Sequence, residues 1–262
     1  MTDRLSARAV ADVMLAVGSP HLWQRLTALL RAIAPFSYSV AFGYHGDARP
    51  MALFDDFPAD KWQVFVGQYQ AGPYLLDPFC LACAKPGTSG LFRIKDLAPD
   101  RFYQGEYFRN YYIQTGLAEE IGYFVALPCG VMVVLSLMRS DRVFSVREFR
   151  SLQAVFPIVE AAIRLHWPTL SHQFSHETNE RSQPPRSPNL GQAFDNFGQS
   201  LLTPREREVV EYTLKGHSGE ATGMILNIAP GTVRIHRRNI YTKLGISSQG
   251  ELFARFIATL SG

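Results

Sequence analysis

Apolar residues near the start of the chain recur every three or four positions, which is the spacing of one face of an α-helix. They form two runs: Ala9, Val10, Val13 and Met14, and then Leu22, Leu26, Leu29 and Leu30. Gly18 and Pro20 lie between the runs and interrupt helical structure. The pattern predicts two helices separated by a turn.

Short extended runs follow these helices. Residues 39–42 and 51–54 are separated by a turn-rich segment that contains Gly46 and Asp47, and this arrangement predicts a hairpin. A helix is predicted over residues 59–69. Residues 121–127 and 131–138 predict a second hairpin, which turns near Gly130.

A long amphipathic helix is predicted over residues 145–167. Ser145 is of the residue type that caps a helix start, and Glu148 three residues later completes a capping box. Helices therefore bracket an antiparallel sheet, so we expect an α/β/α sandwich here. With an all-helical C-terminal region, described next, the predicted fold class is α+β.

Residues 168–196 lack apolar periodicity and are rich in Ser, Pro, Gln and Asn. Such a composition buries too little apolar surface to offset the entropy of ordering the chain. We therefore predict a flexible linker over 168–196, which divides the chain into domains at 1–167 and 197–262.

Three helices are predicted after the linker. Thr203, Pro204 and Glu206 supply an N-cap, a proline at the first helical position and a capping box, and Gly216 marks the end of this first helix. Ser218 begins a short second helix. Pro230 opens a third helix after a turn of about three residues, and two helices joined in this way form a helix-turn-helix unit.

The third helix has two different faces. Val233, Ile240 and Leu244 form an apolar face, whereas Arg234, Ile235 and Arg238 lie on another. Arginine on the second helix of such a unit suits the DNA major groove, where it donates two hydrogen bonds to guanine or pairs with phosphate. The alternative from spacing alone is a solvated basic helix of no special function. Our predicted DNA contacts are Thr232, Arg234, Ile235, Arg237, Arg238 and Lys243.

Composition narrows the class of protein. The 262 residues are 47% hydrophobic and 19% charged, as in a globular protein with a packed core. No apolar run reaches the roughly 18 residues of a transmembrane helix, and the N-terminus lacks the pattern of a secretory signal. We therefore expect no membrane partner and a cytoplasmic location.

The charge is unevenly distributed. Residues 196–262 hold eight basic and five acidic side chains, which accounts for the whole formal net charge of +3. A neutral body joined to a basic tail indicates a nucleic-acid partner.

The three cysteines predict no disulfide framework. Cys80 and Cys83 have a Cys-x-x-Cys spacing, but no second ligand pair accompanies them, so we predict no metal, no cofactor and buried packing instead. Cys129 has no recognisable His and acid partners in the sequence, so we predict that the protein is not an enzyme.

The C-terminal region resembles the DNA-binding domain of LuxR/FixJ/NarL regulators over about 60 residues. The resemblance rests on residues in the family order and spacing: Leu202 to Glu206, Gly216, Thr232, Val233, His236, Asn239, Ile240, Lys243 and Leu244. It implies that the third helix reads DNA and that a fourth helix, at about 248–260, forms a homodimer. Leu252, Phe256 and Leu260 are the candidate dimer face, with closure of the domain's own core as the alternative.

The sequence departs from the family pattern in two places, which involve three residues. Thr222 and Gly223 stand where Ile-Ala is usual, and Ala229 stands where a capping Ser is common. Glycine inside a helix costs roughly 1 kcal/mol, and an uncapped start costs about as much. We expect these departures to weaken the domain locally.

The N-terminal half resembles the autoinducer-binding domain of LuxR-type quorum-sensing regulators, of the orphan type that has no paired lactone synthase. Trp62, Tyr69, Tyr74 and the Asp77-Pro78 pair carry the resemblance. It implies a pocket for a small-molecule signal, either an acyl-homoserine lactone or another small metabolite. We predict that Tyr111 or Tyr112, from the aromatic segment that follows, closes this pocket. The alternatives are ordinary core aromatics and, for Asp77, a turn residue before proline.

The resemblance therefore implies a ligand-responsive regulator that binds double-stranded DNA at an inverted repeat, with RNA polymerase as a further candidate partner. The alternative is a regulator with the same DNA-binding tail but no small-molecule pocket, controlled by a protein partner or by phosphorylation.

Overall fold

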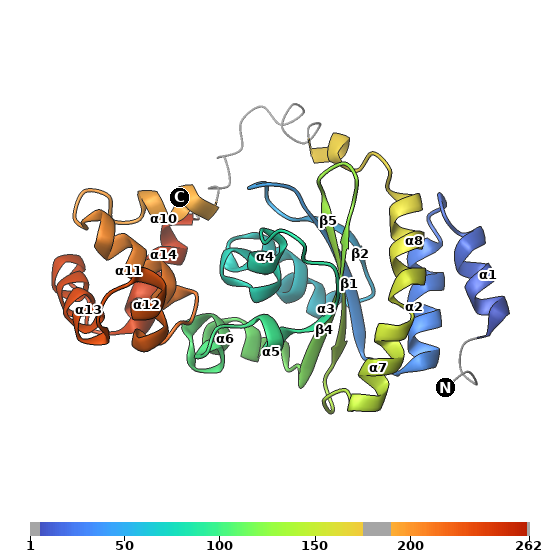
Figure 1. Ribbon diagram of the computed structural model, residues 1–262, viewed down its shortest axis with the longest axis horizontal. Helices are drawn as coiled ribbons and strands as arrows, with labels where there is room; N and C mark the ends of the chain where they lie inside the picture. The colour runs from blue at the N-terminus through green and yellow to red at the C-terminus, as the bar shows by residue number, and fades with distance from the viewer. Residues whose placement is uncertain (1–5, 175–189, 261–262) are drawn as a thin grey trace. The chain divides into compact units, whose positions relative to one another are not determined.

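The computed structural model describes residues 6–174 and 190–260, and these form two compact units (Figure 1). Unit 1 is drawn from Met1–Trp62, Ala82–Leu97 and Leu117–Ser182, and unit 2 from Gln63–Leu81, Ala98–Gly116 and Gln183–Gly262. Two segments from the first half of the sequence thus belong with the C-terminal helices. The predicted limits 1–167 and 197–262 do not coincide with these units.

Unit 1 is built on an antiparallel sheet with the order β2-β1-β5-β4-β3. Both predicted hairpins are present, and the short β3 is an edge strand that the sequence pattern did not reveal. The strands are β1 (Tyr38–Tyr44), β2 (Met51–Asp55), β3 (Gly90–Arg93), β4 (Glu119–Ala126) and β5 (Met132–Arg139).

Helices α1 (Ala7–Leu15), α2 (Leu22–Ile33), α7 (Val146–Ala154) and α8 (Phe156–His166) lie on one side of this sheet (Figure 1). The prediction of one continuous helix over 145–167 is wrong, because α7 ends at Ala154 and Pro157 lies in the first turn of α8. A proline nitrogen has no hydrogen to donate, and its ring favours a helix start over a helix interior. The predicted capping box of Ser145 and Glu148 is confirmed.

The core of unit 1 lies between the sheet and these helices. Leu26 and Leu30 of α2 are fully buried with Tyr123 of β4, whose hydroxyl donates a 2.8 Å hydrogen bond to the Leu152 carbonyl of α7. Leu170 and Phe174 are buried in the same core. The predicted linker is therefore too long at this end, and its residues 175–189 lie outside the described chain.

A buried arginine at the end of β5 also escaped the sequence analysis. Arg139, 2% exposed, donates two hydrogen bonds to Glu148 at 2.7 and 3.1 Å and one to the Pro35 carbonyl at 2.6 Å. These bonds from Arg139 hold the pKa of Glu148 at about 2, well below its ordinary value. One ion pair thus joins the last strand, the start of α7 and the loop that precedes β1.

Short and irregular elements make up the first-half segments of unit 2. The predicted helix over 59–69 is only partly regular: α3 (Ala59–Trp62) is followed by a π-helix, Gln63–Gln68, in which the adjacent Phe65 and Val66 are both buried. The remaining elements before the C-terminal helices are η2 (Pro73–Leu76), α4 (Pro78–Cys83), α5 (Ile94–Leu97), η3 (Phe102–Gln104), α6 (Glu106–Asn110) and η4 (Tyr112–Thr115). Of the elements in this region, α3 and α5 belong to unit 1, and the last two residues of α4 are also counted there.

The C-terminal part of unit 2 is wholly helical: α10 (Leu190–Asn196), α11 (Pro204–Leu214), α12 (Gly219–Leu226), α13 (Pro230–Leu244) and α14 (Gln249–Leu260). An antiparallel sheet with flanking helices and a helical C-terminal region confirms the predicted α+β class. Within the described residues, no helix has the length and apolar character needed to cross a membrane.

Candidate nucleic-acid interface and ligand site

Helices α11, α12 and α13 form the predicted helix-turn-helix unit. Thr203 and Glu206 make a complete capping box at the start of α11. Ser218 caps α12 by accepting a 3.0 Å hydrogen bond from the Ala221 amide. Ala229 gives α13 no side-chain cap, as its residue type predicted.

The turn between α12 and α13 explains one of the two departures from the family pattern. Asn227 ends α12 in the left-handed conformation, and the Ile228 amide donates a 2.9 Å hydrogen bond to the Gly223 carbonyl. A Cβ on Gly223 would lie 2.7 Å from the Ile228 carbonyl oxygen. Gly223 therefore permits the close approach of the turn, a role that the expectation based on helix propensity did not include.

Gly223→Ala is expected to destabilise the protein by about 1 to 3 kcal/mol, although alanine is the better helix former, because the added methyl group overpacks the turn. The matched control is Gly231→Ala in α13, where a Cβ meets nothing within 4 Å and φ is not positive. We expect this control to stabilise the protein by up to about 1 kcal/mol. Urea denaturation of both variants checks the pair, and equal effects would contradict the proposed steric role.

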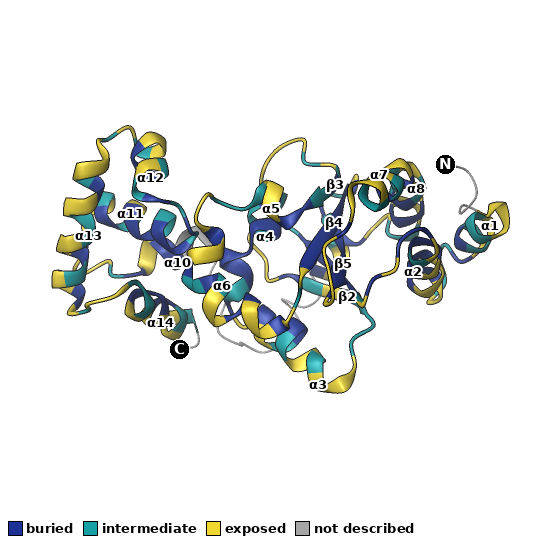
Figure 2. Cartoon of the chain, turned by 90° about the horizontal axis from the view of Figure 1, so that it is seen from below, coloured by how far each residue is buried: buried dark blue, intermediate teal, exposed yellow. Residues whose placement is uncertain are grey.

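One face of α13 is exposed, as the yellow segments of this helix show in Figure 2. Arg234, Ile235 and Arg238 are exposed, with Ile235 at 53%, whereas Val233, Ile240 and Leu244 are buried. Ile235 is an apolar side chain that unit 2 leaves exposed, and it lies on the same face as two arginines. Such a combination is typical of a surface that contacts a partner. These residues have the division between the two faces that the sequence predicted.

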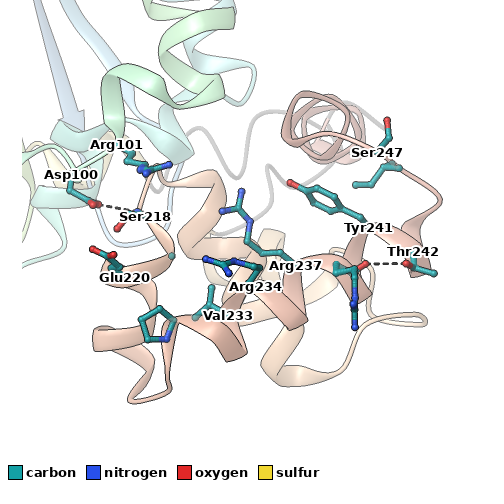
Figure 3. Close-up of a pocket in the computed structure, with 14 residues that line it drawn as sticks. Asp100, Arg101, Ser218, Glu220, Val233, Arg234, Arg237, Tyr241, Thr242 and Ser247 are labelled. Atoms are coloured by element: carbon teal, nitrogen blue, oxygen red, sulfur yellow. Dashed lines mark hydrogen bonds between the residues drawn. The ribbon is translucent and has the colours of Figure 1, made fainter.

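The same helix borders a cavity of about 840 Å³ in unit 2, shown in Figure 3. Arg234, Arg237 and Arg238 line it together with Tyr241. Three guanidinium groups along one wall give the cavity a positive potential that favours an anionic partner.

Two of the predicted DNA contacts have partners inside the protein. The Lys243 amine lies 2.6 Å from the Glu206 carboxylate, and an Arg237 guanidinium nitrogen donates a 2.9 Å hydrogen bond to Gln249. Lys243 thus links α13 to α11, and Arg237 links α13 to α14. Thr232, in the first turn of α13, is half-buried.

The candidate dimer face on α14 requires a correction. Leu252 and Phe256 are 1% and 0% exposed, and Phe256 stacks on Phe194 of α10 with ring centroids 4.7 Å apart. A side chain this deeply buried cannot also contact a second protomer without rearrangement. The alternative, closure of the domain's own core, accounts for these two residues, and only Leu260 of the three is half-buried.

Four of the six predicted ligand contacts lie together in unit 2. The Tyr69 ring lies 6.3 Å from that of Tyr74 and 6.2 Å from that of Tyr111, and its hydroxyl donates a 2.6 Å hydrogen bond to Asp77. All four side chains are buried. The structure thus places a buried carboxylate against Tyr69, whose ring is flanked by the rings of Tyr74 and Tyr111.

Asp77 also has a local role. Its other carboxylate oxygen accepts a 3.0 Å hydrogen bond from the Phe79 amide, so Asp77 caps the start of α4, as the turn alternative predicted. Burial raises its pKa to about 6, although the Tyr69 hydroxyl and the backbone amides act in the opposite direction. A carboxyl group with this pKa sits close to its titration point at physiological pH, as is common at functional sites.

The other two predicted ligand residues have different surroundings. Tyr112 belongs to a neighbouring aromatic cluster, with its ring 5.4 Å from Phe108 and 5.9 Å from Phe102. Trp62 is 44% exposed and falls in unit 1. Residue type alone did not distinguish an exposed aromatic from a buried one.

Cys80 and Cys83, the Cys-x-x-Cys pair, are both half-buried in the structure. Cys80 and Cys83 form no disulfide, and no group of three or more metal-ligating side chains occurs among the described residues. Burial raises the pKa of the Cys80 thiol, which keeps it protonated and poorly reactive.

Comparison with known proteins agrees with the helix-turn-helix geometry. Residues 200–256 match the family described as bacterial regulatory proteins, luxR family. A chain of Aeromonas salmonicida described as an HTH-type transcriptional regulator in the exeN 3′ region is 32% identical over 183 residues, which cover 69% of this chain and 93% of the relative. The transcriptional activator protein PhzR of Pseudomonas fluorescens is 30% identical over 129 residues, 49% of this chain and 45% of PhzR.

The chain therefore belongs to the luxR family of bacterial regulatory proteins. The family and these relatives are described as regulators of transcription and not as enzymes. The VqsR LBD domain of Pseudomonas aeruginosa has a similar fold, with a TM-score of 0.52 at 24% identity, and the match covers 61% of this chain and 94% of that domain.

Proposed function

We propose that the chain binds an inverted-repeat operator as a two-fold dimer, through the exposed face of α13. The observation that carries this proposal is the exposure of Arg234, Ile235 and Arg238 on a helix whose opposite face is buried. Side chains of this kind on the second helix of a helix-turn-helix unit contact base edges in the major groove. One such domain reads few bases, so specific binding calls for two copies on a repeated site. We also propose RNA polymerase as a partner of the DNA-bound protein. The proposed location of the protein is the cytoplasm.

Footprinting of the full-length protein on DNA selected from a random pool tests this function. We expect protection of two half-sites about one helical turn, or a multiple of it, apart. Band-shift titration at several protein concentrations then gives the number of protomers on each DNA. Protection of a single half-site by a monomer would contradict the dimer, and the absence of any preferred sequence would contradict operator binding.

We further propose that a small molecule controls this DNA binding from the region of Tyr69, Tyr74, Asp77 and Tyr111. The fold likeness to a domain titled an LBD and the buried carboxylate among aromatic rings support it. A carboxylate in apolar surroundings suits a ligand with an N–H donor, either uncharged or cationic, while the rings cover its apolar part. To act as a switch, such a ligand must bind two arrangements of the protein with different affinities.

A further inference from the structure

Within unit 2, a segment from the first half of the chain is fixed to the loop between α11 and α12. The Arg101 amide donates a 3.1 Å hydrogen bond to the Gly216 carbonyl, and the Asp100 carboxylate accepts a 3.0 Å bond from the Ser218 amide. Gly216 has φ +93°, and a Cβ on it would lie 3.3 Å from the Phe102 Cα. The absence of a side chain at Gly216 therefore lets residues 100–102 lie directly against this loop.

This attachment gives Asp100 and Arg101 different electrostatic roles. Burial alone would raise the pKa of Asp100, but the Ser218 hydrogen bonds and the charge of His217 hold it below its ordinary value. The negatively charged Asp100 carboxylate thus lies at the N-terminus of α12, where the helix dipole stabilises an anion. Arg101 is exposed, and among the described residues no carboxylate pairs with its guanidinium group.

Arg101 lines the same cavity as the arginines of α13 (Figure 3). The cavity wall thus contains the guanidinium groups of Arg101, Arg234, Arg237 and Arg238, against two carboxylates, those of Asp100 and Glu220. The four guanidinium groups outnumber the two carboxylates, so the wall has an excess of positive charge even with Asp100 ionised. An excess of this kind on the exposed side of a DNA-reading helix favours a phosphate group.

We propose that Arg101, which lies outside the helix-turn-helix unit, is a further DNA-binding residue that pairs with a backbone phosphate beside the bases read by α13. Asp100 acts as a positioning residue that holds Arg101 against α12. The proposal rests on the DNA binding proposed above. It requires residues 98–102 to stay attached to α12 in the DNA complex.

Band-shift titrations of the full-length protein at several salt concentrations test this role, with Arg101→Ala, Arg101→Lys and the matched control Arg109→Ala. Arg109 is also an exposed arginine of the same segment of unit 2, but it pairs with Glu106 and does not line the cavity. Each lost phosphate contact lowers the slope of log K against log salt concentration by about 0.9, and the proposed dimer loses two contacts. The ratio of wild-type to Arg101→Ala affinity is therefore expected to shrink about 12-fold between roughly 50 and 200 mM salt.

We expect the loss in Arg101→Ala to be equal on operator and unrelated DNA, with recovery in Arg101→Lys and no change in Arg109→Ala. Asp100→Ala is expected to reproduce part of the loss, because it releases Arg101 from α12. An unchanged salt dependence in Arg101→Ala, or an equal loss in Arg109→Ala, would overturn the proposal. If the wild-type protein itself binds no DNA, the proposed function fails before Arg101 is tested, so the two failures are distinguishable.

Discussion

Replacing Arg234 and Arg238 with alanine is expected to abolish the preference for operator over unrelated DNA. Both side chains are exposed on α13, and a two-bond contact from arginine to guanine contributes about 1 to 3 kcal/mol of discrimination. Each single variant should therefore relax the sequence preference by this amount at one position of each half-site. Band-shift competition with single-base operator variants measures the change.

The double variant is compared with Arg150→Ala, which removes an exposed arginine of α7 in unit 1. This control loses a positive charge far from α13 in the sequence and is expected to keep full operator preference. Circular dichroism confirms that each variant is folded. Unchanged operator affinity in the folded Arg234→Ala/Arg238→Ala protein would show that α13 is a solvated basic helix and not the reading helix.

Asp77→Asn is expected to remove a large pH dependence of stability. The folded-state pKa of Asp77, about 6, lies above its ordinary value of 3.8, so between these pH values the folded chain holds a proton that the unfolded chain has released. The free energy of unfolding of the wild type should therefore fall as pH rises from about 4 to about 6. The loss should reach about 3 kcal/mol, because each pKa unit corresponds to 1.36 kcal/mol.

Urea denaturation of wild type and Asp77→Asn at pH 4 and pH 7 checks this expectation. The difference in the free energy of unfolding between the two proteins is compared at each pH, because titratable groups common to both contribute equally and drop out of the difference. Asp77→Asn should gain stability relative to the wild type as pH rises. Tyr69→Phe serves as a matched variant: it removes the 2.6 Å bond that lowers the pKa of Asp77, so the pH-dependent window should extend above pH 6. A stability difference between wild type and Asp77→Asn that does not change with pH would contradict the assignment.

The same substitutions distinguish classes of ligand. Asp77→Asn keeps the shape of the side chain and removes its charge, so a cationic ligand should lose far more affinity than a neutral amide. Asp77→Ala removes the acceptor and should weaken both by at least about 1 to 3 kcal/mol. Reporter activation with a ligand found by thermal stabilisation measures this. Equal responses of wild type and folded Asp77→Ala would leave Asp77 as the helix cap and place the ligand site elsewhere.

Local sequence rules predicted the regular elements well and the irregular ones poorly. Capping boxes at Ser145 and Thr203, and the turn before Pro230, were found because capping depends on residues within one helical turn of each other. The edge strand β3 was missed because its four residues are too few for a periodic signal. The break at Pro157 was overlooked because the amphipathic pattern continues across it.

The exposed face of α13 could be predicted from the sequence, but the surroundings of several individual side chains could not. The exposed face of α13 followed from the sequence, because this helix has one apolar face that packs inside the unit and an opposite polar face. The sequence did not show that Lys243 would be paired with Glu206 or that Trp62 would be exposed. Both outcomes depend on segments far away in the chain.

The sequence by itself determined the family, the helix-turn-helix unit and the two hairpins, since each depends on spacing and capping within short segments. Only the tertiary structure decided that Phe256 belongs to the unit's own core and that Asp77 is shared between Tyr69 and α4. It also brought Arg101 beside α13, although more than a hundred residues separate them. The physical reason is that burial, pairing and pKa depend on which distant groups exclude water from a side chain, and no local pattern encodes that choice.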